Sequence, residues 1–249
     1  MSGHSKWSTI KRKKEKIDAK RGRIFTRLIK EITVAAREGG GDPDANPRLR
    51  TAIATAKADN MPQNNIERAI KKGTGELPGI RYDEAHFEAY GPGGVAILIE
   101  TLTDNKNRTT AEIRHILTKY GGSMGETGSV VWIFHQKGLV HIEKGDIDED
   151  RLLEVSLDGG AEDVSLQGDL YEITTDPSKV ESVKESLKKE KFKILKAEVT
   201  KTPQSTVPIK DKKSADKILS IMEALEELED VQNVYANFDI PDEVLEKIS

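Results

Sequence analysis

The chain has 249 residues, of which 36% are hydrophobic and 33% are charged, and it contains no cysteine. The lack of cysteine excludes disulfides, thiolate zinc sites and cysteine nucleophiles. No stretch approaches the roughly 18 uninterrupted apolar residues of a membrane span, and no apolar signal region follows the basic N-terminus, so we expect a cytoplasmic protein with no membrane partner.

Positive charge is concentrated at the N-terminus. Residues 1–30 hold 11 Lys and Arg against 2 acidic residues, whereas residues 81–249 hold 21 basic against 34 acidic residues. One strongly basic end on an acidic chain is typical of a protein that brings that end to a polyanion. A solvated, charged helix face is the simpler alternative, but charges of one sign are grouped here rather than interspersed.

The first 80 residues predict a small helical domain. Residues 1–16 look extended or weakly helical, and their polar character predicts an arm that is mobile until it binds. A helix follows, because apolar residues recur at spacings of three and four: Phe25, Leu28, Ile29, Ile32 and Ala36. Asn46 and Pro47 predict the N-cap and first residue of a second helix, and a third starts at Pro62 and stops at Gly73.

Past Gly79 strands and helices alternate. We expect two strands about a turn over residues 86–104, and a helix over 108–122 in which Thr109 and Glu112 form a capping box. Residues 129–134 and 138–143 predict two further strands.

The order from residue 138 to about 202 is β-α-β-β-α-β, which specifies a ferredoxin-like arrangement. Residues 203–213 are a linker by composition, followed by an amphipathic helix and a strand. This last pair cannot bury its apolar faces alone, so we expect it to join the incomplete unit before the insertion. The predicted fold class is α+β with three domains: a basic helical domain (1–80), a discontinuous α/β domain (81–134 plus 206–240) and an inserted ferredoxin-like domain (135–205).

Motifs for catalysis or metal binding are missing from the sequence. The five histidines form no i, i+4 pair, and Asp146 to Asp150 lack the glycine and the final glutamate of a calcium loop. Residues 91–94, with the sequence GPGG, are better explained as a tight turn than as a phosphate loop. We therefore expect no enzyme, cofactor, metal or small-molecule substrate.

The candidate site is the basic N-terminal run. Lysine and arginine neutralise phosphates and release counterions. Trp7 either stacks on an unpaired base or packs back on the helical domain, and His4 adds stacking or a phosphate contact. The expected nucleic-acid-binding residues are His4, Ser5, Lys6, Trp7, Lys11, Arg12, Lys13, Lys14, Lys16, Lys20, Arg21, Arg23, Arg27 and Lys30.

Several long motifs occur in a fixed order: GHSKW, DAKRGRIFTRLIKEI, NPRLRTAIATAKADNMPQNNIERAIKKGTG, YGPGGVAILIETLTDNKNRT and GGSMGETGSVVWIF. Together they resemble the YebC/PmpR family from residue 2 to about residue 240. Many members carry the name probable transcriptional regulatory protein, and a mitochondrial relative is a translational activator of cytochrome c oxidase subunit I. The resemblance implies three domains, a nucleic-acid partner, and contacts from His4 to Trp7 and from Lys20, Arg21 and Arg23. The one departure is Asn64, where aspartate is also expected.

We therefore predict a cytosolic, DNA-binding transcriptional regulatory protein that acts through its basic arm and helix. The alternative is a ribosome-associated translation factor that binds ribosomal RNA or tRNA, with ribosomal proteins as further partners, and relieves stalled translation. A basic arm that carries a tryptophan suits irregular RNA, whose unstacked bases are accessible. A scaffold that binds proteins through its acidic faces is a third interpretation.

Overall fold

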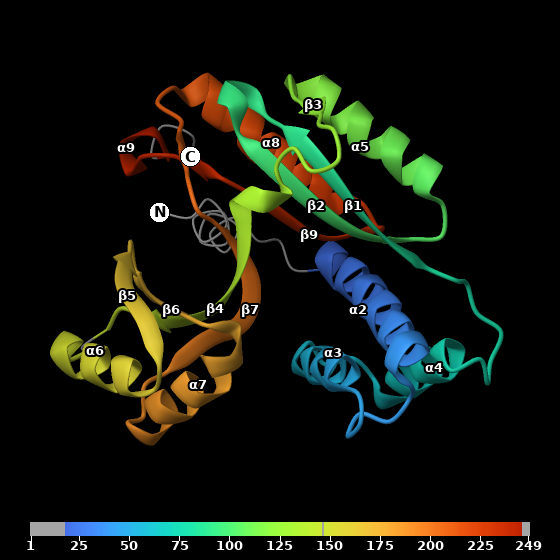
Figure 1. Ribbon diagram of the computed structural model, residues 1–249, viewed down its shortest axis with the longest axis horizontal. Coiled ribbons are helices and arrows are strands. Elements are labelled where there is room, and N and C mark those ends of the chain that lie inside the picture. The colour runs from blue at the N-terminus through green and yellow to red at the C-terminus, as the bar shows by residue number, and fades with distance from the viewer. Residues whose placement is uncertain (1–17, 146, 246–249) are drawn as a thin grey trace.

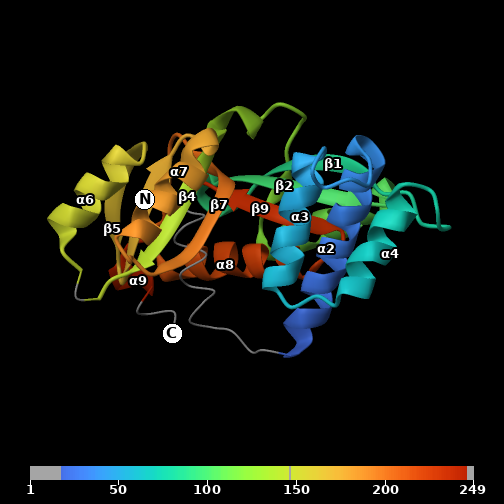
Figure 2. The same ribbon diagram turned by 90° about the horizontal axis from the view of Figure 1, so that it is seen from below.

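A computed structural model describes residues 18–145 and 147–245, with side chains for 22–145, 147–241 and 243–245. Within these residues Figure 1 shows a helical part in blue, a middle α/β part at the top and a second sheet with two helices in yellow and orange. The helical part and the second sheet lie on the same side of the middle sheet (Figures 1 and 2). The structure thus confirms the predicted α+β class.

The helical part consists of α2 (Asp18–Gly39), α3 (Pro47–Ala58) and α4 (Gln63–Gly73). Its core contains the apolar stripe expected on α2, together with Leu49, Ala56 and Ile66. Asn46 caps α3 as predicted, because its side-chain oxygen accepts from the backbone N–H of Leu49 at 3.1 Å.

Gly73 is the last residue of α4, as predicted, and it also lies close to α2. A Cβ at this position would meet the backbone oxygen of Thr33 well inside van der Waals contact, and would lie 2.8 Å from the Cβ of Ala36. Glycine therefore lets α4 approach α2 closely, besides ending the helix.

The middle part is a sheet with strand order β3-β1-β2-β9. Its elements are β1 (Asp83–Tyr90), β2 (Ala96–Thr103), α5 (Lys106–Tyr120), β3 (Ser123–Met124), α8 (Lys212–Glu227) and β9 (Val231–Ala236). Helices α5 and α8 cover one face, and β9 pairs antiparallel with β2 although more than 120 residues separate them. The predicted discontinuous domain is therefore confirmed.

The start of α5 differs from the prediction. Asn105 is the N-cap, and its side chain accepts from the N–H of Arg108 at 3.1 Å. Thr109, expected in a capping box with Glu112, is instead buried one turn inside the helix. Tertiary contacts of Thr109, described below, explain why a cap-like residue lies there.

The inserted part has strand order β5-β6-β4-β7, the antiparallel order of a ferredoxin-like unit, as predicted. It contains β4 (Phe134–Glu143), α6 (Glu149–Asp158), β5 (Ala161–Gln167), β6 (Leu170–Thr175), the short helix η3 (Pro177–Lys179), α7 (Val180–Lys189) and β7 (Ile194–Pro203). Residues 129–134 do not form the expected strand, since Val131–Ile133 are a 3-10 turn (η2) and the strand begins at Phe134.

The remaining elements are short. They are the 3-10 turn η1 (Pro92–Gly94), β8 (Val207–Pro208), β10 (Phe238–Asp239) and α9 (Asp242–Leu245). The predicted linker thus contains β8, which pairs in parallel with β10. The domain limits that we gave above stay predictions.

Candidate nucleic-acid interface

Most residues of the expected interface lie outside the described part of the chain. This holds for His4, Ser5, Lys6, Trp7, Lys11, Arg12, Lys13, Lys14 and Lys16. Lys20 and Arg21 lie in the first turn of α2, but their side chains are not described. For these positions a contact with nucleic acid stays a prediction.

The described basic residues of α2 contact the C-terminal end of α8 and the segment that follows it. Arg23 Nη1 lies 3.6 Å from Glu227 Oε1, and the Arg27 guanidinium donates to the backbone oxygen of Glu226. One turn further on, the Lys30 ammonium donates to the backbone oxygen of Glu229 at 3.1 Å. Positions 23, 27 and 30 share one helix face, so a single basic stripe meets the acidic segment 226–230.

Asp230 is the centre of this contact. Its carboxylate accepts from Lys30 Nζ at 2.6 Å, from Arg108 Nη2 at 2.7 Å and from Thr109 Oγ1 at 2.7 Å. Thr103 Oγ1 adds a fourth bond at 2.9 Å. Burial by itself raises the pKa of Asp230, but the bonds from Lys30, Arg108 and Thr109 lower it to about 2. The carboxylate is therefore ionised and joins α2, α5 and the end of β2 to the segment before β9.

Two members of the expected interface, Arg27 and Lys30, have partners within the protein in this structure. Lys30 is only 6% exposed and already has a carboxylate partner, so in this structure its ammonium cannot reach a phosphate. Arg27 is half-buried, and burial lowers the pKa of its guanidinium. Both side chains attach the helical part to the middle part. Arg23, whose side chain is 38% exposed, remains accessible at the edge of the contact.

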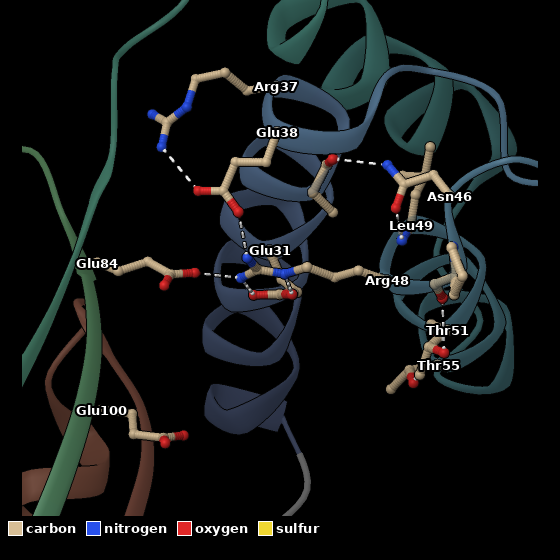
Figure 3. Close-up of polar contacts among 12 residues, drawn as sticks. Glu31, Arg37, Glu38, Asn46, Arg48, Leu49, Thr51, Thr55, Glu84 and Glu100 are labelled. Atoms are coloured by element: carbon tan, nitrogen blue, oxygen red, sulfur yellow. Dashed lines mark hydrogen bonds and ion pairs between the residues drawn. The ribbon is translucent and has the colours of Figure 1, made fainter. Parts of the chain in front are cut away.

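A second junction connects α3 with α2 and β1 (Figure 3). Arg48 on α3 makes a two-point contact with Glu31 on α2 at 2.7 and 3.0 Å, and reaches Glu84 on β1 at 2.6 Å. Its Nη1 also donates to Glu38 at 2.7 Å. The side-chain bond with Glu31 is the largest of several effects that raise the pKa of Arg48. Three carboxylates thus hold one guanidinium where α2, α3 and β1 meet.

Asp230 and Arg48 were not predicted from the sequence as partners across domains. One signal was present: the run EALEELED at 223–230 places several acids at the end of a helix, where the dipole favours cations. Such an end needs nearby positive charge, and the basic stripe of α2 supplies it.

Other polar clusters do not form a recognisable centre for chemistry. His141 and Glu172 are a buried cross-strand pair at 3.1 Å in the inserted sheet. Over residues 18–145 and 147–245, no three His, Asp or Glu side chains come together in a way that could hold a metal ion. The helices of this part of the chain are also too short or too polar to cross a membrane.

Comparisons with known proteins match nearly the whole chain. A family model described as the TACO1/YebC protein N-terminal domain matches residues 5–76, and one described as the TACO1/YebC second and third domain matches residues 82–238.

Curated relatives have similar lengths. A protein from Sulfurihydrogenibium sp. is 55% identical over 249 residues, covering 100% of this chain and 99% of the relative. One from Desulforapulum autotrophicum is 58% identical and covers 98% of each chain. Both are named probable transcriptional regulatory protein. A crystal structure of a conserved hypothetical protein from Aquifex aeolicus is 50% identical, has a TM-score of 0.79, and covers 91% of this chain and 93% of its own.

Proposed function

The chain belongs to the TACO1/YebC family, and on this basis we propose that it is a cytosolic, DNA-binding regulator of transcription rather than an enzyme. The arm, residues 1–17, and the first turns of α2 are the binding element. The observation that carries the proposal is the grouping of 11 basic residues against 2 acidic ones in residues 1–30. The names of the curated relatives support transcription as the process.

The contacts between α2 and the end of α8 also support the proposal. Arg27 and Lys30 fasten α2 to the acidic end of α8, so α2 forms a fixed base for the arm. Residues 1–17 contribute six Lys and Arg and one Glu, and Lys20, Arg21 and Arg23 extend the positive charge into the helix. Each phosphate that these cations neutralise releases a counterion, which favours binding at low salt.

The acidic remainder of the chain limits where on the protein nucleic acid can bind. The net negative charge of residues 81–249 repels a polyanion, so binding energy comes from the N-terminal end. A duplex or RNA strand therefore meets the protein at the start of α2.

Charge substitutions test this proposal. Changing Lys11, Arg12, Lys13 and Lys14 to Ala removes up to four phosphate contacts, which should flatten the slope of log K against log salt by up to about 3–4. The matched control replaces four exposed lysines of the inserted part by Ala: Lys144, Lys188, Lys189 and Lys193. Fluorescence anisotropy with a labelled duplex and a labelled RNA, at several salt concentrations, gives both slopes. Equal slopes for the two variants would remove the arm from the interface.

A ribosome-associated translation factor is the second candidate, and Trp7 within the basic arm favours it. An indole among cations suits RNA whose bases are unstacked. Sedimentation with ribosomes through a salt wash supports this candidate. A preference for one defined duplex over random duplexes at about 150 mM salt supports the transcriptional one.

A further inference from the structure

Strand β5 is a free edge of the inserted sheet. In the order β5-β6-β4-β7 it pairs only with β6, and Ala161–Gln167 make no other backbone hydrogen bond with described residues. A free edge carries a row of backbone N–H and C=O groups with which another extended segment can pair. Figures 1 and 2 show β5 and α6 at the rim of the inserted part, on the side away from the helical part.

This edge lacks the usual protection against pairing. Proteins protect free edges with lysine, proline or a bulge. The opposite edge strand, β7, contains two lysines and a bulge, and its Lys201 bonds to Glu100 of the middle part. In contrast, β5 has no lysine or proline, and its bulge lies at its start, between Ala161 and Asp163. Residues 163–167 therefore remain a regular strand that is open on one side.

Three exposed leucines lie along the same edge. Leu166 on β5 is 44% exposed, and Leu153 and Leu157 on α6 are 44% and 49% exposed. Leu166 is paired with Tyr171, whose side chain belongs to the core between the sheet and its helices. Side chains of paired residues lie on the same face of a sheet, so Leu166 lies on the face that α6 covers.

The leucines of α6 lie on the flank of that helix next to the free edge. Leu152 is buried against the sheet, and Arg151 reaches Glu190, just after α7, at 2.9 Å. Leu153 is two residues after Arg151, about 200° further around the helix, so it lies on the flank opposite α7. Leu157 follows one turn later on the same flank. The open strand and these leucines form one surface, which we call the β5 ledge.

The β5 ledge is acidic. Residues 147–169 hold eight acidic residues and one basic residue, Arg151. Asp150, Asp158 and Asp163 are exposed, and none of them has a cation within 4 Å among the described residues. These carboxylates repel nucleic acid and attract a partner of positive charge.

We infer that β5 binds an extended, basic segment of another protein, which adds a strand to the inserted sheet. Backbone bonds to β5 hold the segment, and every second side chain packs on Leu153, Leu157 and Leu166. The alternate, basic side chains lie on the other face of the sheet, where Asp163 is located. A second copy joined through the same edge would bring two acidic surfaces together, which is unfavourable. The inference goes beyond the proposed function, because the basic N-terminal end takes no part in this contact.

Peptide binding to the full chain tests the inference. The probe is a labelled ten-residue peptide of alternating lysine and valine with blocked ends, and fluorescence anisotropy gives its affinity. A peptide with glutamate in place of lysine tests charge, and one with two central valines replaced by proline cannot add a strand. Both should bind about tenfold more weakly than the probe. Absence of binding of the probe, or equal affinity for the probe and the proline peptide, would overturn the inference.

Substitutions on the surface locate the contact. Leu153→Ser combined with Leu157→Ser removes exposed apolar groups only and should weaken binding of the probe about fivefold. Asp163→Lys should weaken it about tenfold, because the charge changes sign. The matched control is Leu195→Ser combined with Val199→Ser on β7, where both residues are also exposed, and it should bind the probe like the wild type.

Amide hydrogen exchange gives a readout that needs no substitution. The bound probe should slow exchange over residues 163–167 and leave Ile194–Pro203 of β7 unchanged. Unchanged exchange in β5, with full binding to the leucine double variant, would mean that lysine is attracted to acidic surface in general, and the inference would be overturned. The salt dependence of nucleic-acid binding by the arm is independent of these results, so the proposed function is tested separately.

Discussion

Replacing Asp230 by Asn should destabilise the junction between α2 and the middle part by about 3–5 kcal/mol. The carboxylate is 4% exposed and accepts from Lys30, Arg108 and two threonines. The Lys30 side chain is 7% exposed, so its ammonium would be left buried beside an uncharged amide. Removal of one partner of a buried pair is costly because the other charge loses its compensation.

The pH dependence of stability gives a second magnitude for the contribution of Asp230 to the free energy of unfolding. The pKa of Asp230 is about 2 in the folded protein, against about 3.9 in an unfolded chain. A carboxyl group whose pKa is lowered by folding stabilises the folded state at pH values above its unfolded pKa. This stabilisation is lost as the pH falls through its folded pKa. Asp230 should therefore contribute about 2–3 kcal/mol that disappears between about pH 4 and pH 2. Asp230→Asn should lack this part of the pH dependence.

Urea unfolding and amide hydrogen exchange along α2 measure the effect. Exchange in α2 should accelerate in Asp230→Asn, and the exposed control Asp163→Asn should behave like the wild type. The double variant Lys30→Met with Asp230→Asn should recover a large part of the loss, because no buried ammonium remains without a partner. A loss below about 1 kcal/mol with unchanged exchange in α2 would refute the assignment of Asp230 as the centre of the junction.

Two further substitutions probe the packing. Glu88→Gln puts an N–H2 donor beside three backbone N–H groups and should cost about 2 kcal/mol in urea unfolding, whereas an unchanged midpoint would contradict a role of this carboxylate in fixing the 128–131 loop. Gly73→Ala should lower stability by about 1–3 kcal/mol, because its Cβ meets the backbone of Thr33. In contrast, Gly22→Ala, with nothing within 4 Å of its Cβ, should raise stability by up to about 1 kcal/mol. If Gly73→Ala and Gly22→Ala shift the midpoint of thermal unfolding in the same direction, the close packing of Gly73 on α2 is wrong.

Local patterns predicted most of the fold. The spacing of apolar residues on α2 and the cap at Asn46 depend on neighbouring residues, and the structure confirms both. The ferredoxin-like order also followed from the succession of elements, because that order leaves few ways to bury every face. The predictions for Thr109 and for residues 129–134 were wrong because contacts with residues far along the chain override local preference there. Thr109 donates a hydrogen bond to Asp230, and the backbone of the 128–131 loop donates to Glu88.

The candidate site was predictable only as a charge pattern. Grouped cations indicate a polyanion, but composition cannot tell that the partner of Lys30 is a carboxylate 200 residues later. A basic stripe has the same sequence signature whether it meets phosphate or glutamate. Exposure of Trp132 was equally hidden, since VVWIF has the composition of a buried strand.

The discontinuous middle part has a consequence for synthesis of the chain. Ribosomes add about 5–20 residues per second, so the cations of α2 emerge roughly 10–40 s before residues 226–230 that cover them. During that interval β2 also lacks β9, and its edge is open. The nascent protein therefore passes through a form in which Arg27 and Lys30 are uncovered, and the last tenth of translation supplies the segment that covers them.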